Sequence, residues 1–125
     1  MNQALLILLG GGIGSLLRYW TSIATYSYLG RDFPYGTLAV NIIGSFLMGF
    51  LSILLIERLN NQADSLRALL LIGFLGGFTT FSSFSIETFN LLEAGETMKG
   101  ILNMASSLGF CMLSVTLGAL LGRQL

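Results

Sequence analysis

The sequence contains no histidine, one cysteine and few charged residues. Without histidine, the chain lacks the commonest metal ligand and the usual general base at neutral pH. Cys111 stands alone, so neither an internal disulfide nor a cysteine metal cluster can form. Charged residues make up 10% of the chain, and a formal net charge of +0 supplies no basic face for nucleic acid. These absences argue against hydrolytic or metal-centred catalysis and against nucleic-acid binding, so we predict that the chain is not an enzyme.

Hydrophobic residues are abundant instead. They make up 54% of the 125 residues, and the mean hydropathy is +0.80. A soluble domain of this size cannot bury so much apolar surface. The apolar residues fall in long runs, each comparable to the roughly 20 residues that cross a hydrocarbon layer as a helix. The sequence predicts an all-α membrane protein with a single transmembrane domain over residues 1–125, with helices at about residues 4–28, 37–57, 68–92 and 98–122.

The basic residues are divided evenly between the two sides of the predicted membrane domain. Four spans place both termini on one side, together with the polar connection at residues 57–67. That side carries Arg58, Arg67 and Arg123, and the other carries Arg31, Lys99 and, leaning toward it, Arg18. The positive-inside rule then gives no preferred orientation. Two explanations stay open: short loops give a noisy count, or oppositely inserted copies pair as an antiparallel dimer.

The third hydrophobic stretch contains the least lipid-like segment, residues 76–85 (GGFTTFSSFS). Two glycines followed by two threonines weaken a helix through backbone entropy and through hydroxyl competition for backbone groups. Backbone groups freed by a break are tolerated in a membrane only where protein, water or an ion satisfies them. We therefore expect a broken third helix, with an unbroken helix of closely packed small residues as the alternative.

Polar and aromatic side chains recur at helical spacing on three of the predicted helices. The sets are Thr37, Asn41 and Ser45; Phe81 and Phe84; and Ser107, Cys111 and Ser114. Aromatic rings have a positive edge, so ring edges can favour an anion without a fixed charge. Packing between helices is the alternative for each set. Arg18 lies inside the first span, where it must face protein or water or extend to the interface.

Three segments resemble the signature segments of one family, the Fluc (CrcB) fluoride channels. They are residues 36–46 (GTLAVNIIGSF), 76–84 (GGFTTFSSF) and 11–19 (GGIGSLLRY). The resemblance implies an antiparallel, dual-topology homodimer in the bacterial inner membrane. It implies that this dimer exports fluoride passively, down the electrochemical gradient, and so relieves fluoride toxicity.

The resemblance also implies roles for individual residues. Ring edges of Phe81 and Phe84 would meet fluoride, Asn41 and Ser82 would donate hydrogen bonds to it, and Arg18 would help to form an anion-attracting entrance. Thr37 and Ser107 would belong to the same pathway. A structural sodium ion would be held between the two copies by the backbone carbonyls of Gly76 and Thr79. The chain departs from the family pattern at Ser83, where many members have threonine, and at Cys111, where a hydroxyl is expected.

Two other functions remain as alternatives. A proton-coupled exporter of the small multidrug resistance type is also a short four-helix protein, but it needs a titratable carboxylate in the membrane interior, usually in its first helix. Residues 4–28 contain neither aspartate nor glutamate. A scaffold subunit that transports nothing would tolerate leucine and alanine at the polar positions.

Overall fold

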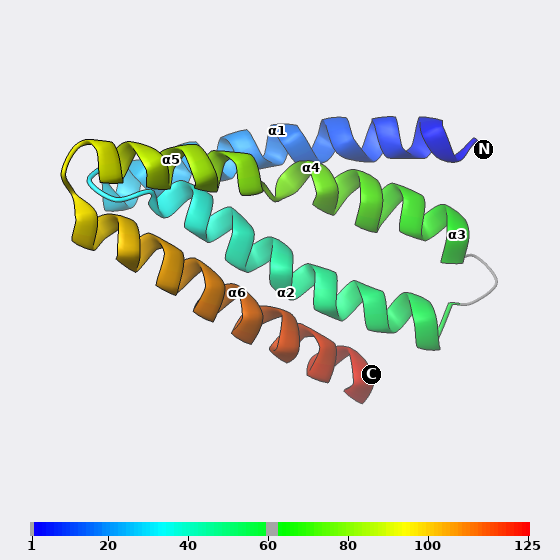
Figure 1. Ribbon diagram of the computed structural model, residues 1–125. Helices are drawn as coiled ribbons and strands as arrows, with labels where there is room; N and C mark the ends of the chain where they lie inside the picture. Colours follow the sequence, from blue (N-terminus) through cyan, green and yellow to red (C-terminus); the bar gives the residue numbers. More distant parts are fainter. Residues whose placement is uncertain (1, 60–62) are drawn as a thin grey trace.

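A computed structural model describes residues 2–59 and 63–125 of the chain, and every regular element within these ranges is helical (Figure 1). The elements are α1 (Gln3–Leu29), α2 (Tyr35–Glu57), α3 (Ala63–Leu66), the π-helix η2 (Arg67–Leu75), α4 (Gly76–Phe78), α5 (Phe81–Glu93) and α6 (Thr97–Gln124). Asn60, Asn61 and Gln62, which the sequence analysis assigned to a polar connection, lie outside the described residues.

Within the described ranges, four helical stretches are long and apolar enough to cross a membrane: Gln3–Leu29, Tyr35–Glu57, Ala63–Glu93 and Thr97–Gln124. This confirms the prediction of an all-α, multi-pass membrane protein. The third stretch begins before the predicted residue 68, because α3 and the start of η2 include Asp64 and Arg67. A helix that continues beyond the hydrocarbon layer can carry such residues, so the end of an apolar run does not mark the end of the helix.

Both chain termini lie at one end of the molecule, together with the end of α2 and the start of α3 (Figure 1). The turns that join α1 to α2 and α5 to α6 lie at the opposite end. Gly30 and Gly95 take φ values of 81° and 80° in these two turns, a backbone conformation that favours glycine. The arrangement is that of an up-and-down bundle of four spans.

Glycines bring the helices together in two tight pairs. A Cβ atom on Gly14 of α1 would meet the carbonyl group of Phe74 in η2, and one on Gly118 of α6 would meet the carbonyl oxygen of Phe46 in α2. Gly49 of α2 faces the carbonyl oxygen of Val115 in the same way. Such contacts allow backbones to approach closely and are typical of membrane helix interfaces. The chain is therefore built from α1 against η2 and α4, and from α2 against α6.

We predict that Gly118→Ala lowers the free energy of unfolding by about 1–3 kcal/mol, because the added methyl group has to push α2 and α6 apart. Gly109→Ala on the same helix is the matched control, since a Cβ there meets no atom within 4 Å. Denaturation in detergent micelles measures both. Equal stability of the two variants would contradict the close packing of α2 on α6.

Candidate functional site

The helix is interrupted at two residues near the middle of the third span. Thr79 (φ −86°, ψ 159°) and Thr80 (φ −153°, ψ 118°) have extended backbone between α4 and α5. The side-chain oxygen of Thr80 accepts a hydrogen bond from the Ser83 backbone N–H at 3.1 Å, which caps the start of α5. The extended residues lie within the segment where the sequence predicted a weakened helix.

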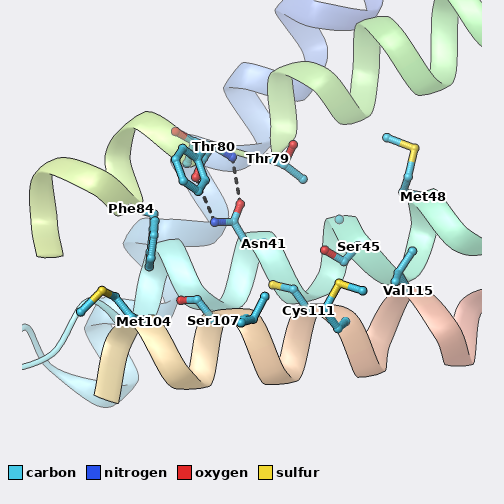
Figure 2. A pocket seen from close by; sticks show the side chains of 14 residues that line it. Asn41, Ser45, Met48, Thr79, Thr80, Phe84, Met104, Ser107, Cys111 and Val115 are labelled. Atoms are coloured by element: carbon cyan, nitrogen blue, oxygen red, sulfur yellow. Dashed lines mark hydrogen bonds between the residues drawn. The ribbon is translucent and has the colours of Figure 1, made fainter. Parts of the chain in front are cut away.

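Asn41 of α2 pairs with the backbone at this interruption (Figure 2). Its Nδ2 donates to the Thr80 carbonyl oxygen at 2.9 Å, and its Oδ1 accepts from the Thr80 N–H, also at 2.9 Å. Both backbone groups of Thr80 are thus satisfied by one amide. Because an unpaired backbone group in a membrane costs several kcal/mol, this pair explains how the chain can leave the helical conformation here.

Two carbonyl groups lose their usual helical donors at the same place. In an unbroken α-helix, the carbonyls of Gly76 and Thr79 would accept from the N–H groups of Thr80 and Ser83. Those N–H groups donate instead to Asn41 Oδ1 and Thr80 Oγ1. Gly76 and Thr79 are the two residues whose carbonyls would hold a sodium ion according to the family resemblance.

A cavity of about 660 Å³ adjoins the interruption (Figure 2). Its walls come from α2, from the residues around the start of α5, and from α6. The lining residues are Asn41, Gly44, Ser45, Met48, Thr79, Thr80, Phe81, Phe84, Met104, Ser107, Leu108, Cys111, Met112 and Val115. None of these side chains carries a formal charge at neutral pH, so the wall combines apolar surface with hydroxyl, thiol and amide groups.

Phe81 and Phe84 form the aromatic part of this wall. Their ring centroids lie 5.3 Å apart and the ring planes are tilted by 45°. The Phe84 ring points from α5 toward α6, where Ser107 and Cys111 line the opposite side (Figure 2). The structure therefore brings together four of the predicted pathway residues, Asn41, Phe81, Phe84 and Ser107, and places Thr79 of the predicted cation site beside them.

The other predicted pathway residues lie outside this cavity wall. Thr37 is buried on α2, one turn before Asn41. Ser82 is exposed, with its hydroxyl 3.4 Å from that of Thr80. Arg18 is half-buried on α1, one turn beyond Gly14 and so on the face that packs against the third span. Lys99 and Glu96 form the one ion pair among the described residues, so no described carboxylate pairs with Arg18.

Sequence reasoning assigned no role in the site to three polar residues that shape it, although Thr88 lies at helical spacing from Phe84. Thr80 had no assigned role beyond weakening the helix, although threonine is a favoured N-cap residue and can signal a helix start. Asn103 and Thr88 are also buried, and they are bonded to each other. Asn103 lies one turn before Ser107, so the polar stripe on α6 could have been extended back to it.

Glu87 belongs to a second cavity, of about 370 Å³, near the turn between α1 and α2. The cavity is also lined by Tyr26, Arg31, Asp32 and Asn90. Glu87 Oε1 is buried and has no hydrogen-bond partner among the residues that the structure describes. Glu87 is thus absent from the wall that contains Asn41 and the two phenylalanines.

The helices and the cavity define a multi-pass membrane protein whose membrane domain holds a largely apolar, uncharged cavity with a few polar groups on its wall. The sequence profile of the family described as "CrcB-like protein, Camphor Resistance (CrcB)" matches residues 5–119. The chain belongs to this family, which confirms the resemblance seen in the signature segments.

Curated relatives cover almost the whole chain. A protein of Coxiella burnetii is 55% identical over 123 residues, which cover 98% of this chain and 99% of the relative. One of Magnetococcus marinus is 50% identical over 94% of each chain. One of Rhizobium leguminosarum bv. trifolii is 46% identical over 100% of this chain and 99% of the relative. Each is named "Fluoride-specific ion channel FluC", a class of protein that is not enzymatic.

We predict that Asn41→Leu destabilises the fold by about 1–3 kcal/mol for each backbone group of Thr80 that it leaves unpaired. Denaturation in micelles measures the loss, and hydrogen exchange at the Thr80 amide reports on the site directly. The exposed Asn90 of α5 offers a matched control, Asn90→Leu. Slow exchange at Thr80 in Asn41→Leu would show that the pair is dispensable.

Proposed function

We propose that this chain forms a fluoride channel that exports fluoride passively across the bacterial inner membrane. The observation that carries the proposal is the helix interruption paired by Asn41, which places Phe81 and Phe84 beside hydroxyl groups on a cavity without formal charge. Relatives that cover almost the whole chain are named as fluoride-specific channels. The family match and these names favour a channel over the exporter and scaffold alternatives.

The chemistry of the cavity suits a small, strongly hydrated anion. Passage requires that the water around fluoride be replaced by many donors and positive edges, none of which holds the ion too firmly. The rings of Phe81 and Phe84 supply positive edges, and Ser107 supplies a hydroxyl on the facing wall. Asn41 uses one amide hydrogen on Thr80 and keeps a second one for an ion.

Other residues would act outside the cavity. Arg18 is half-buried without a described carboxylate partner, so its charge is available to attract anions toward the pathway. Ser82 is exposed beside Thr80 and would donate to an ion before or after it passes the rings. Thr37 would extend the polar stripe of α2 to one turn before Asn41.

The exposed side of the site supports pairing of two copies. Phe81 is 77% exposed although it also lines the cavity, and Ser82 and Ser85 near it on α5 are exposed as well. Polar groups in the membrane interior normally face protein or water. A second copy would cover them. The equal division of basic residues allows the two copies to insert in opposite directions and form an antiparallel, dual-topology homodimer.

The backbone at the interruption fits a small hard cation. The carbonyls of Gly76 and Thr79 have lost their helical donors, and carbonyl oxygens are suitable ligands for such an ion. We propose that these carbonyls from both copies hold a structural sodium ion at the dimer interface. The positive charge of the ion would attract the carbonyl oxygens of both copies and so hold the two interrupted helices against each other.

We predict that liposomes loaded with potassium fluoride and carrying the purified protein release fluoride rapidly once a potassium ionophore dissipates the opposing voltage. Liposomes loaded with chloride should retain it. A fluoride electrode follows the release. Proton-coupled release of organic cations without fluoride release would favour the exporter alternative.

The variant Phe81→Ile tests the ring edge in the same assay. The rate of fluoride release should fall, because isoleucine offers no positive ring edge to the ion. Phe110→Ile is the control, because Phe110 is exposed on α6 outside the cavity wall. Unchanged release from Phe81→Ile would remove the proposed role of the ring.

We predict dual orientation from the balance of basic residues. In a Cys111→Ser background, a single cysteine introduced by Ala94→Cys lies in the exposed turn between α5 and α6. An impermeant thiol reagent should then label similar fractions of the protein from the two sides of the membrane. Labelling from one side only would reject the antiparallel dimer. The even division of basic residues would then reflect only the small number of charges in short loops.

A further inference from the structure

A buried amide on α6 holds α5 in place. Asn103 is 2% exposed, which makes it the least exposed polar residue among those the structure describes. Its Nδ2 donates to Thr88 Oγ1 on α5 at 2.8 Å, and Thr88 is 6% exposed. Neither residue lines the cavity beside Asn41. Polar groups inside a membrane domain are costly unless they are paired, so a buried pair away from the pathway requires an explanation.

The hydrogen bonds continue from Thr88 to the backbone of Phe84. Thr88 Oγ1 donates its single proton to the Phe84 carbonyl oxygen at 2.8 Å, so the same oxygen is free to accept from Asn103. The amide on α6 is therefore connected, through one hydroxyl, to the residue whose ring lines the cavity. Bonds in such a chain polarise and strengthen one another.

The contact between α5 and α6 is close at this point. A Cβ on Gly100, nearly one turn before Asn103, would lie 2.7 Å from Cδ2 of Leu92 and 3.8 Å from the Thr88 carbonyl oxygen. The absence of a side chain at Gly100 therefore lets α5 pack closely against α6. Asn41 of α2 holds the start of α5 through its hydrogen bond to Thr80. Asn103 of α6 holds α5 two turns further along, at Thr88.

We propose that Asn103 and Thr88 are a positioning pair that sets the gap between the Phe84 ring and the α6 wall. Asn103 and Ser107 lie one turn apart on the same rigid helix, so anchoring Phe84 to Asn103 also fixes its distance from Ser107. The inference rests on the fluoride pathway proposed above. Neither member of the pair touches the ion; both act through the position of Phe84.

The test compares fluoride release from liposomes carrying the wild type, Asn103→Leu, Thr88→Val and the double variant. Each single variant should lower the rate on the order of tenfold, as expected when a positioning contact is lost. Because Asn103 acts through the Thr88 hydroxyl, the double variant should be no slower than Thr88→Val alone. Multiplied losses in the double variant would show that Asn103 acts directly on the ion and would overturn the proposal.

Matched variants separate positioning from general stability. Thr88→Ser keeps the hydroxyl and should retain most of the wild-type rate. Thr116→Val removes a hydroxyl of the same kind, which donates to the Met112 carbonyl at 2.8 Å on the exposed face of α6, and should leave the rate unchanged. If Asn103→Leu does not fold, the contrast between Thr88→Val and Thr88→Ser decides alone, and equal rates for these two would overturn the proposal.

The wild-type measurement distinguishes the two levels of inference. If the wild type releases no fluoride, the channel function itself fails. If the wild type releases fluoride and Asn103→Leu or Thr88→Val matches its rate, only the positioning pair fails.

Discussion

The pairing of the Thr80 backbone by Asn41 is the interaction on which the site depends. A membrane offers no water to an unpaired backbone group, so a helix can open there only where another group takes over its hydrogen bonds. Asn41 supplies one donor and one acceptor from a single side chain, at matching distances. The direction of α5, the place of the phenylalanine rings and the redirected carbonyl groups of Gly76 and Thr79 all follow from that exchange.

Contacts between the other helices hold α2 and the third span in place around the Asn41–Thr80 pair. Glycine contacts join α1 to the first half of the third span and α2 to α6. The second half, α5, starts at the interruption and is bonded to α2 through Asn41 and to α6 through Asn103. Side-chain amides on two different helices thus hold α5, which is separated from α4 by the extended residues Thr79 and Thr80.

The sequence predicted the spans and the weak segment because both depend on local composition. Long apolar runs indicate helices in lipid, and the run of glycine, threonine and serine indicates where a helix is weak. The pairing of Asn41 with Thr80 could not be predicted in this way, since the two residues lie 39 positions apart and the stripe on α2 does not identify a partner. Asn103 was missed because its role depends on the packing of α5 against α6, which follows from the tertiary fold.

The backbones of α2 and α6 come into direct contact at Gly49 and Gly118. Gly49 and Gly118 set the separation of these two helices through backbone contacts, so that separation does not depend on the side chains that line the cavity beside them. Residues on that lining can be exchanged one at a time without moving the scaffold. An exchange at a lining residue such as Cys111 therefore changes the chemistry of the cavity without changing the distance between α2 and α6.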